Sequence, residues 1–238
     1  MTTLGVKFQS HGSSLVGRMW LTQGEGERPT VLLLHGLPGI DQNHDLAYAL
    51  RDAGWNSLLM HYRGCWGSEG NYSLHNILPD IDVMLDFLLN DEDVDNNKIV
   101  VCGHSLGGWA AAMTGARRPE VAGVVSLAGV GDWKQMDLTE EGAEAGMTRF
   151  LTNVSAETLI RETQELDSAV EAVEKLNGRP LLIIHGDSDA AVDISHSHAL
   201  QKRYPTHTTL HTVADADHGF AWERDEMIGA VIEWLGKI

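Results

Sequence analysis

The sequence predicts an α/β fold with a mostly parallel central sheet and helices on both of its faces. Short continuous apolar runs, such as TVLLL at 30–34 and KIVV at 98–101, alternate with longer segments whose apolar residues recur at helical spacing. Continuous apolar strands are typical of parallel sheets that are covered on both faces. The 238 residues suffice for one domain, which we expect to span 1–238.

The first half of the chain predicts four strands and two helices. GVKFQSHGSSLVGRMWLT at 5–22 predicts an antiparallel hairpin, because a Gly-Ser turn separates two strand-like runs. TVLLLHG at 30–36 and NSLLMHYRG at 56–64 predict strands on either side of a helix over 41–53. A second helix is expected over 79–90, where Ile81, Leu85 and Leu88 share a face and Pro79 stands near the start.

The second half continues the alternation. KIVVCGHS at 98–105 predicts a strand that leads directly into an alanine-rich helix. Further strands are expected in VAGVVSLAGV at 121–130, PLLIIHGDSD at 180–189 and HTTLHTVADADHG at 207–219. The segment from Trp222 to Leu235 predicts the last helix, since Met227, Val231 and Leu235 form one apolar stripe.

Residues 131–178 interrupt this rhythm. The segment is too long for a simple crossover helix, and Leu159, Leu166, Val170 and Val173 are spaced for one face of a helix. An insertion at the edge where strands end predicts a helical lid over a site. The alternative is a longer crossover that packs against the side of the sheet.

Composition limits the partners and the compartment. Seventeen Lys and Arg against 34 Asp and Glu give a net charge of −17, which disfavours nucleic acid and anionic membranes as partners. Cys65 and Cys102 are too few for a disulfide framework, and the chain shows neither a signal peptide nor an apolar run of transmembrane length. We expect a cytoplasmic protein with a small-molecule substrate. Its oligomeric state, a homodimer included, is left open.

Polar residues follow four of the predicted strands, where ligands bind in parallel sheets. One strand ends in the turn Gly103-His104-Ser105-Leu106-Gly107-Gly108, and others end in HGLPG, HGDSD and DADHG. A serine becomes a nucleophile when an imidazole takes its proton, and a carboxylate holds that imidazole in the required tautomer. The chain order Ser, Asp, His fits such a triad.

From Val31 onward, about four fifths of the chain resembles the α/β-hydrolases. The resemblance lies in LLHGLPG, HYRGCWGSEG, GHSLGG, HGDSDAAVD and DADHGF. The YRG turn followed by GSEG is similar to the branch of prolyl-oligopeptidase-like, dienelactone-hydrolase-like and cinnamoyl-esterase-like proteins. These motifs are specific for fold and mechanism and weak for substrate.

The resemblance implies a role for each matching residue. Ser105 is the expected nucleophile and His218 the expected base. Asp189 is the expected acid, because it is the fifth residue of the pattern H-G-x-x-D-x-x-V, which Val192 completes. Asp187 is then expected to form a turn.

The resemblance also predicts an oxyanion hole and surrounding structure. Its donors are expected to be the backbone N–H groups of Leu106 and Leu37, since Pro38 has no N–H. Arg63 is expected to pair with a buried carboxylate.

The chain has twelve histidines, and most of them are expected to be structural. His104 is expected to pack beside the serine turn, whereas His196 and His198 are expected to lie on an acidic helix and to face solvent. His35, His61 and His185 stand at strand ends, but no cysteine or carboxylate spacing supports a metal site. We therefore expect neither a metal nor a cofactor.

These residues predict a carboxylesterase-type serine hydrolase that cleaves small esters, with a short or aromatic acyl group, through an acyl-enzyme. Apolar residues of the insertion are expected to form part of the acyl pocket: Trp133, Met136, Met147 and Phe150. A prolyl-oligopeptidase-like peptidase is the alternative, although such proteins carry a large propeller domain and only about thirty residues precede the hydrolase motifs here. Dienelactone-type hydrolysis usually employs a cysteine where this chain has Ser105. A non-catalytic receptor that keeps the fold is the third alternative.

Overall fold

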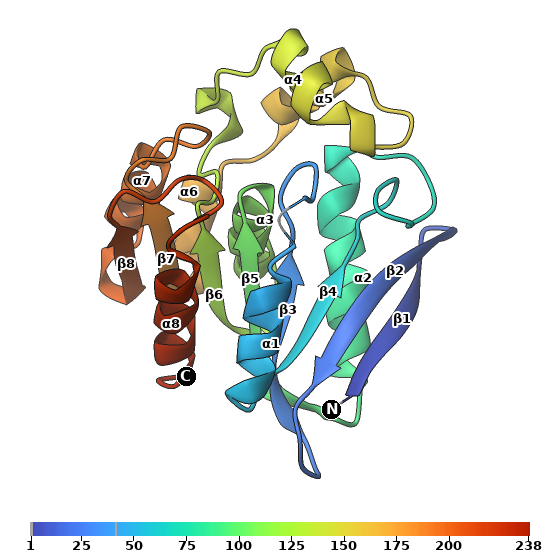
Figure 1. Ribbon diagram of the computed structural model, residues 1–238, viewed down its shortest axis with the longest axis vertical. Coiled ribbons are helices and arrows are strands. Elements are labelled where there is room, and N and C mark those ends of the chain that lie inside the picture. The colour runs from blue at the N-terminus through green and yellow to red at the C-terminus, as the bar shows by residue number, and fades with distance from the viewer. Residues whose placement is uncertain (1, 41) are drawn as a thin grey trace.

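A computed structural model describes residues 2–40 and 42–238 of the chain. In this part of the chain an eight-stranded sheet runs through the molecule in the order β1-β2-β4-β3-β5-β6-β7-β8 (Figure 1). The strands are β1 (Thr2–Ser10), β2 (Ser13–Leu21), β3 (Arg28–Leu34), β4 (Asn56–Met60), β5 (Val94–His104), β6 (Val121–Leu127), β7 (Leu181–Gly186) and β8 (Thr208–Val213).

The pairing confirms the predicted hairpin and the mostly parallel sheet. β1 and β2 pair antiparallel, and β2 also runs antiparallel to β4. From β4 to β8 every neighbouring pair is parallel. All residues of β4 and β7 are buried, and their sequences, NSLLM and LLIIHG, are mostly apolar, as expected for strands that are covered on both faces.

Helices cover both faces of the sheet. α1 (His44–Asp52) and α8 (Arg224–Leu235) lie together on one face, nearest the viewer in Figure 1. α2 (Ile77–Leu89), α3 (Leu106–Arg117) and α7 (Ser195–Arg203) pack on the other. The predicted helix over 41–53 is therefore α1, although Asp41 lies outside the described residues.

The insertion is divided between two places. α4 (Glu140–Gly146) and α5 (Ala156–Glu165) lie beyond the carboxyl ends of the strands, at the top of Figure 1. α6 (Ala169–Ala172) and the 3₁₀ turn Val173–Leu176 pack against α3 instead. The first part has the position expected of a lid and the second that of a crossover. That the first part acts as a lid stays a prediction.

The single helical face predicted from Leu159 to Val173 is wrong, because the chain leaves the helix at Leu166 (φ −74°, ψ 143°). This break places the carbonyl of Asp167 where it accepts a hydrogen bond of 2.9 Å from the buried indole of Trp109. Satisfying that buried donor favours the interruption over a continuous helix.

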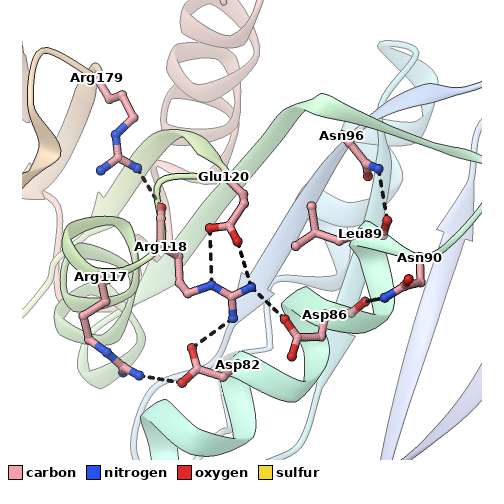
Figure 2. Close-up of polar contacts among 9 residues, drawn as sticks. All are labelled: Asp82, Asp86, Leu89, Asn90, Asn96, Arg117, Arg118, Glu120 and Arg179. Carbon is pink, nitrogen blue, oxygen red and sulfur yellow. Dashed lines mark hydrogen bonds and ion pairs between the residues drawn. The ribbon is translucent and has the colours of Figure 1, made fainter.

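Ion pairs join α2 to the end of α3 (Figure 2). Arg117 pairs with Asp82, and Arg118 reaches Asp86 at 2.7 Å and Glu120 at 3.2 Å. Several of these groups are exposed, so each pair contributes about 0–1 kcal/mol.

Arg179 closes the carboxyl-terminal end of α3. Its guanidinium donates hydrogen bonds to the carbonyls of Gly115, Arg118 and Val121, at 2.7–2.9 Å. Such carbonyls lack partners within a helix, and a cation there also suits the helix dipole. Arg179 therefore fixes the junction between α3 and β6.

Arg63 pairs with a buried carboxylate, as predicted. Its Nε lies 2.7 Å from Asp80, whose side chain is fully buried and also accepts a hydrogen bond from Ser10. This pair holds the loop after β4 on α2.

Candidate active site

Ser105 occupies the sharp turn between β5 and α3 that the GHSLGG motif predicts. Its backbone has φ 58° and ψ −117°, a region that costs free energy for any residue with a side chain. The turn also requires glycine on both sides, since a Cβ on Gly103 would collide with Gly107 and one on Gly107 with Leu34. This strained turn places Ser105 directly after the carboxyl end of β5, at the edge of the sheet.

His218 and Asp189 form a short hydrogen bond at the same edge. Nδ1 of His218 lies 2.7 Å from Oδ2 of Asp189. The Asp189 side chain is fully buried, whereas that of His218 is one quarter exposed. The other carboxylate oxygen accepts the backbone N–H groups of Ala191 at 2.8 Å and Val192 at 2.9 Å.

These hydrogen bonds keep Asp189 ionised. Burial alone would raise the pKa of this carboxyl, but hydrogen bonds from His185, His218 and the Val192 N–H outweigh it and hold the pKa well below its ordinary value. Asp187 plays another part, because it is exposed and accepts the Asp215 N–H at 2.7 Å across two neighbouring turns. This geometry agrees with the predicted turn role of Asp187.

His104 packs beside the serine turn, as predicted, and supports His218. Its Nε2 donates a hydrogen bond of 2.7 Å to the His218 carbonyl, and the two ring centroids are 4.7 Å apart. The support comes from the residue directly before Ser105, so the turn and the histidine loop are fixed to each other.

A hollow of about 120 Å³ brings several predicted residues together. The described residues that line it are Gly36, Leu37, Pro38, Gly39, Ile40, His104, Ser105 and His218. Leu37 is thus beside Ser105, and Leu106 follows Ser105 as the first residue of α3. The roles of their N–H groups as oxyanion donors stay predictions.

The four insertion residues do not appear among the described residues that line this hollow. Trp133 is buried with its ring 6.5 Å from that of Trp109, and Met136 and Met147 are half-buried against the same core. Phe150 is exposed and stacks on Trp66 at 5.6 Å. Their contact with substrate stays a prediction.

Trp66 connects Phe150 to the wall of the hollow. Its indole N–H donates a hydrogen bond of 2.6 Å to the carbonyl of Pro38. This contact of Trp66 was not predicted, because nothing local in the sequence indicates which carbonyl an indole N–H will reach.

The prediction that His196 faces solvent is wrong, whereas His198 is exposed as expected. His196 is buried, and its Nδ1 accepts the N–H groups of Gly131 at 3.2 Å and Asp132 at 3.3 Å. The segment around it, SHSHALQKR, carries no acidic residue. The inner face of α7 therefore meets the start of the insertion.

Two residues that position the site, His185 and Arg224, were not predicted from the sequence to have this role. His185 is fully buried, and its Nε2 lies 3.2 Å from Oδ2 of Asp189. Arg224 joins the loop of His218 to α1, since it donates to the carbonyl of Gly219 at 3.3 Å, to Asn43 at 2.9 Å and to Asp45. His185 had a weak signal as a histidine at a strand end. Arg224 had none, because Asn43 stands 181 residues away.

The described residues contain no group of three or more His, Cys, Asp and Glu arranged to hold a metal ion. None of the helices in residues 2–40 and 42–238 is long and apolar enough to cross a membrane.

Comparison with known proteins gives relatives of several kinds. Residues 44–237, more than half of the chain, match the model of the prolyl oligopeptidase family. An uncharacterized protein of Mycobacterium tuberculosis is 35% identical over 112 residues, which are 44% of this chain and 40% of that protein. Acylamino-acid-releasing enzyme 1 of Oryza sativa is 27% identical over 189 residues, 71% of this chain and 24% of that enzyme. The chain thus matches well under half the length of either relative.

Solved structures share the whole fold. Est1E from Butyrivibrio proteoclasticus, with ferulic acid bound, superposes with a TM-score of 0.81 over 98% of both chains at 20% identity. At that identity the similarity concerns the fold alone.

Proposed function

Because the chain belongs to the prolyl oligopeptidase family and has the α/β-hydrolase fold, we propose that it hydrolyses small carboxylic esters through a covalent acyl-enzyme. The hydrogen bond between His218 and Asp189, with His218 and Ser105 in one hollow, is the observation that carries the proposal. The family makes the protein a hydrolase, and the ester specificity is our proposal.

In the proposed mechanism, the N–H at Nδ1 of His218 donates a hydrogen bond to the ionised Asp189, which leaves Nε2 without a hydrogen and free to act as the base. Nε2 takes the Ser105 hydroxyl proton while Oγ attacks the ester carbonyl carbon. The imidazolium then gives this proton to the departing alkoxide, so that an alcohol leaves and an acyl-serine remains. In the second half of the reaction, Nε2 of His218 takes a proton from a water molecule while the water oxygen attacks the acyl carbon. His218 then returns this proton to Oγ of Ser105, so that the carboxylic acid leaves and the serine is restored.

The carbonyl oxygen becomes negative in each tetrahedral intermediate and needs N–H donors. We assign these to Leu106, at the start of α3, and to Leu37 in the wall of the hollow. Preorganised donors of this kind contribute about 3–4 kcal/mol each in other serine hydrolases.

Three features support a small acyl group, short or aromatic. The hollow at Ser105 is small, at about 120 Å³. Trp66 and Phe150 stack beside its wall and offer flat apolar surface. Est1E, which has the same fold, binds ferulic acid, an aromatic acid. The net charge of −17 further disfavours polyanionic substrates.

A peptidase is the second candidate, because the family and the rice acylamino-acid-releasing enzyme favour it. Exposed carboxylates on α4, among them Glu140, Glu141 and Glu144, could bind the amine of a peptide. Their ordinary role is a solvated helix face, and an amide also needs its leaving nitrogen protonated.

The test compares kcat/KM for nitrophenyl butyrate and a cinnamate ester with kcat/KM for aminoacyl and prolyl anilides at about pH 7–8. We expect the esters to be strongly preferred. Efficient anilide cleavage with feeble ester turnover would establish the peptidase instead.

The nucleophile is tested separately. Ser105→Ala should lower kcat on the order of 10³-fold or more, and an organophosphonate should modify the peptide that contains Ser105. Ser195→Ala, on the exposed first turn of α7, is the matched control. An adduct on another serine, with Ser105→Ala still active, would refute the assignment.

A further inference from the structure

The carboxylate of Asp189 contacts a second imidazole, that of His185, besides the ring of His218. Oδ2 accepts the hydrogen bond from His218 at 2.7 Å, and Nε2 of His185 lies 3.2 Å from the same oxygen. His185 ends β7 with no exposed surface, so the contact is shielded from water. One carboxylate oxygen thus lies between two histidine rings, one from the end of β7 and one from the loop after β8.

The surroundings of His185 fix its tautomer. Nε2 also lies 2.8 Å from the carbonyl of Val192, and neither a carbonyl nor an ionised carboxylate can donate a hydrogen. The hydrogen of the neutral ring is therefore on Nε2. Nδ1 is left to accept the hydroxyl proton of Ser197, whose Oγ is 2.6 Å away and fully buried.

The two ends of the Asp189 carboxylate are held in different ways. Oδ1 is held by the backbone N–H groups of Ala191 and Val192. These two bonds leave the carboxylate free to turn about its last torsion, which is broad for aspartate. The single N–H at Nε2 of His185 is shared between the Val192 carbonyl at 2.8 Å and Oδ2 of Asp189 at 3.2 Å, and its contact with Oδ2 opposes that rotation. Ser197 in α7 in turn restricts the ring of His185.

We propose that His185, oriented by Ser197, is a positioning residue that fixes Oδ2 of Asp189 in line with His218 and shares the negative charge of that oxygen. The inference rests on the proposed function, in which His218 is the base. His185 touches no reacting atom and acts through Asp189 alone.

Two effects follow if the His185 donor is removed. The carboxylate becomes less well oriented, so the turnover rate falls. Its charge is also no longer shared, so the imidazolium form of His218 is stabilised and the base is protonated at higher pH. The titratable or charged groups facing His185 are Asp189 in its own loop, Asp193 and His196 at the start of α7, and His218 beyond Asp189.

The experiment compares His185→Leu, which removes the donor, with His185→Gln, whose amide N–H can replace it, and with Ser197→Ala. His198→Gln, on the exposed side of α7, is the control. The kcat and KM for nitrophenyl butyrate are measured from pH 5 to about pH 9, with thermal unfolding to verify the fold.

We expect His185→Leu to lower kcat by about tenfold to a hundredfold with little change in KM. The acidic limb of its kcat/KM profile should move up by about half a pH unit or more. Ser197→Ala should produce smaller changes in the same directions, and His185→Gln should restore most of both. The control should behave as the wild type.

Unchanged kcat and pH profile in folded His185→Leu would overturn the proposal. A fall in kcat with an unmoved acidic limb, equal in the Leu and Gln variants, would also overturn it, because it would indicate a purely structural role. If the Leu variant does not fold, Ser197→Ala and His185→Gln decide by the same two readouts.

A second readout separates this inference from the proposed function. The ring of His218 can be titrated by NMR in the free protein, with no substrate present. If the wild type hydrolyses no ester, the proposed function fails. A higher midpoint pH of the His218 titration in His185→Leu and Ser197→Ala would still support the positioning role. An unmoved titration would refute it.

Discussion

Asp189→Asn tests the candidate triad most sharply, because four donors converge on this carboxylate. Oδ1 accepts two backbone N–H groups, and Oδ2 accepts from His218 and faces His185. Asparagine has one acceptor oxygen and one NH₂ group, which can only donate. If its oxygen keeps the backbone bonds, its NH₂ points at Nδ1 of His218. If the amide is reversed, the NH₂ faces the two backbone donors.

Either arrangement disturbs the candidate triad. In the first, Nδ1 of His218 must accept, so the ring hydrogen moves to Nε2 and the nitrogen that should take the Ser105 proton is blocked. In the second, the amide oxygen still accepts from His218, but the backbone N–H groups of Ala191 and Val192 lose their acceptor, so the loop that carries residue 189 is no longer fixed. Such a change of tautomer lowers kcat by about 10⁴-fold in a well-studied triad. This corresponds to about 5.4 kcal/mol of transition-state stabilisation, at 1.36 kcal/mol for each tenfold change.

Asp187→Asn is the matched control, two residues earlier in the same loop. Its Oδ1 accepts the Asp215 N–H, and an amide oxygen can keep that bond, so kcat should change only a few-fold. The assay is kcat for nitrophenyl butyrate near pH 8, with circular dichroism to verify folding. Full activity in Asp189→Asn, or a larger loss in Asp187→Asn, would refute the assignment of the acid.

Three further predictions concern stability and specificity. Burial lowers the pKa of His35 to about 3 and that of His61 to about 4. Below about pH 6.5 these two histidines therefore bind protons in the unfolded chain but not in the folded one. For each of them, the free energy of unfolding should fall by about 1.4 kcal/mol per pH unit. The melting temperature should therefore fall between pH 6.5 and pH 5, and a flat curve would contradict this. Arg179→Ala removes the guanidinium hydrogen bonds to the Gly115 and Arg118 carbonyls, of which the second still accepts the Val121 N–H, and should lower the free energy of unfolding in urea by about 2 kcal/mol. A loss below about 0.5 kcal/mol would contradict this role of Arg179. Alanine at Met147 and Phe150 should change the ratio of kcat/KM between short and long acyl esters several-fold, which is about 1 kcal/mol; an unchanged ratio would mean that they only pack.

The fold was predictable because its elements are signalled locally. Buried strands such as β7 are continuous apolar runs, and the turn at Ser105 requires glycines that the sequence displays. The hydrogen bond between Asp189 and His218 followed from a motif that places both at strand ends.

The structural features that the sequence did not predict depend on contacts between segments that are far apart in the chain. Local periodicity over 159–173 could not show that the helix would end at Leu166 and that the Asp167 carbonyl would accept a hydrogen bond from Trp109. His196 was expected to face solvent from an acidic helix, but its Nδ1 accepts two backbone N–H groups of the insertion. Buried polar groups of this kind find partners that only the folded chain brings near.

The insertion is attached to the loop after β4 by backbone hydrogen bonds. Cys65 and Leu151 form a β-bridge, and the N–H of Thr152 donates to the Gly64 carbonyl at 2.7 Å. Further along, buried Glu162 accepts the Leu74 N–H at 2.6 Å. A segment that opened freely would have to break the bridge and leave the buried N–H of Leu74 without its acceptor, which costs about 1–3 kcal/mol.

This attachment also reaches the hollow at Ser105. Phe150 stacks on Trp66, and the Trp66 indole holds the carbonyl of Pro38, the residue after the assigned oxyanion donor Leu37. A substitution in this part of the insertion therefore acts in two ways, on the surface available to an acyl group and on the loop that carries Leu37. Met147 has no such aromatic link among the described contacts, since it packs on the core. Alanine at Phe150 should thus lower kcat as well as change selectivity, whereas alanine at Met147 should change selectivity alone.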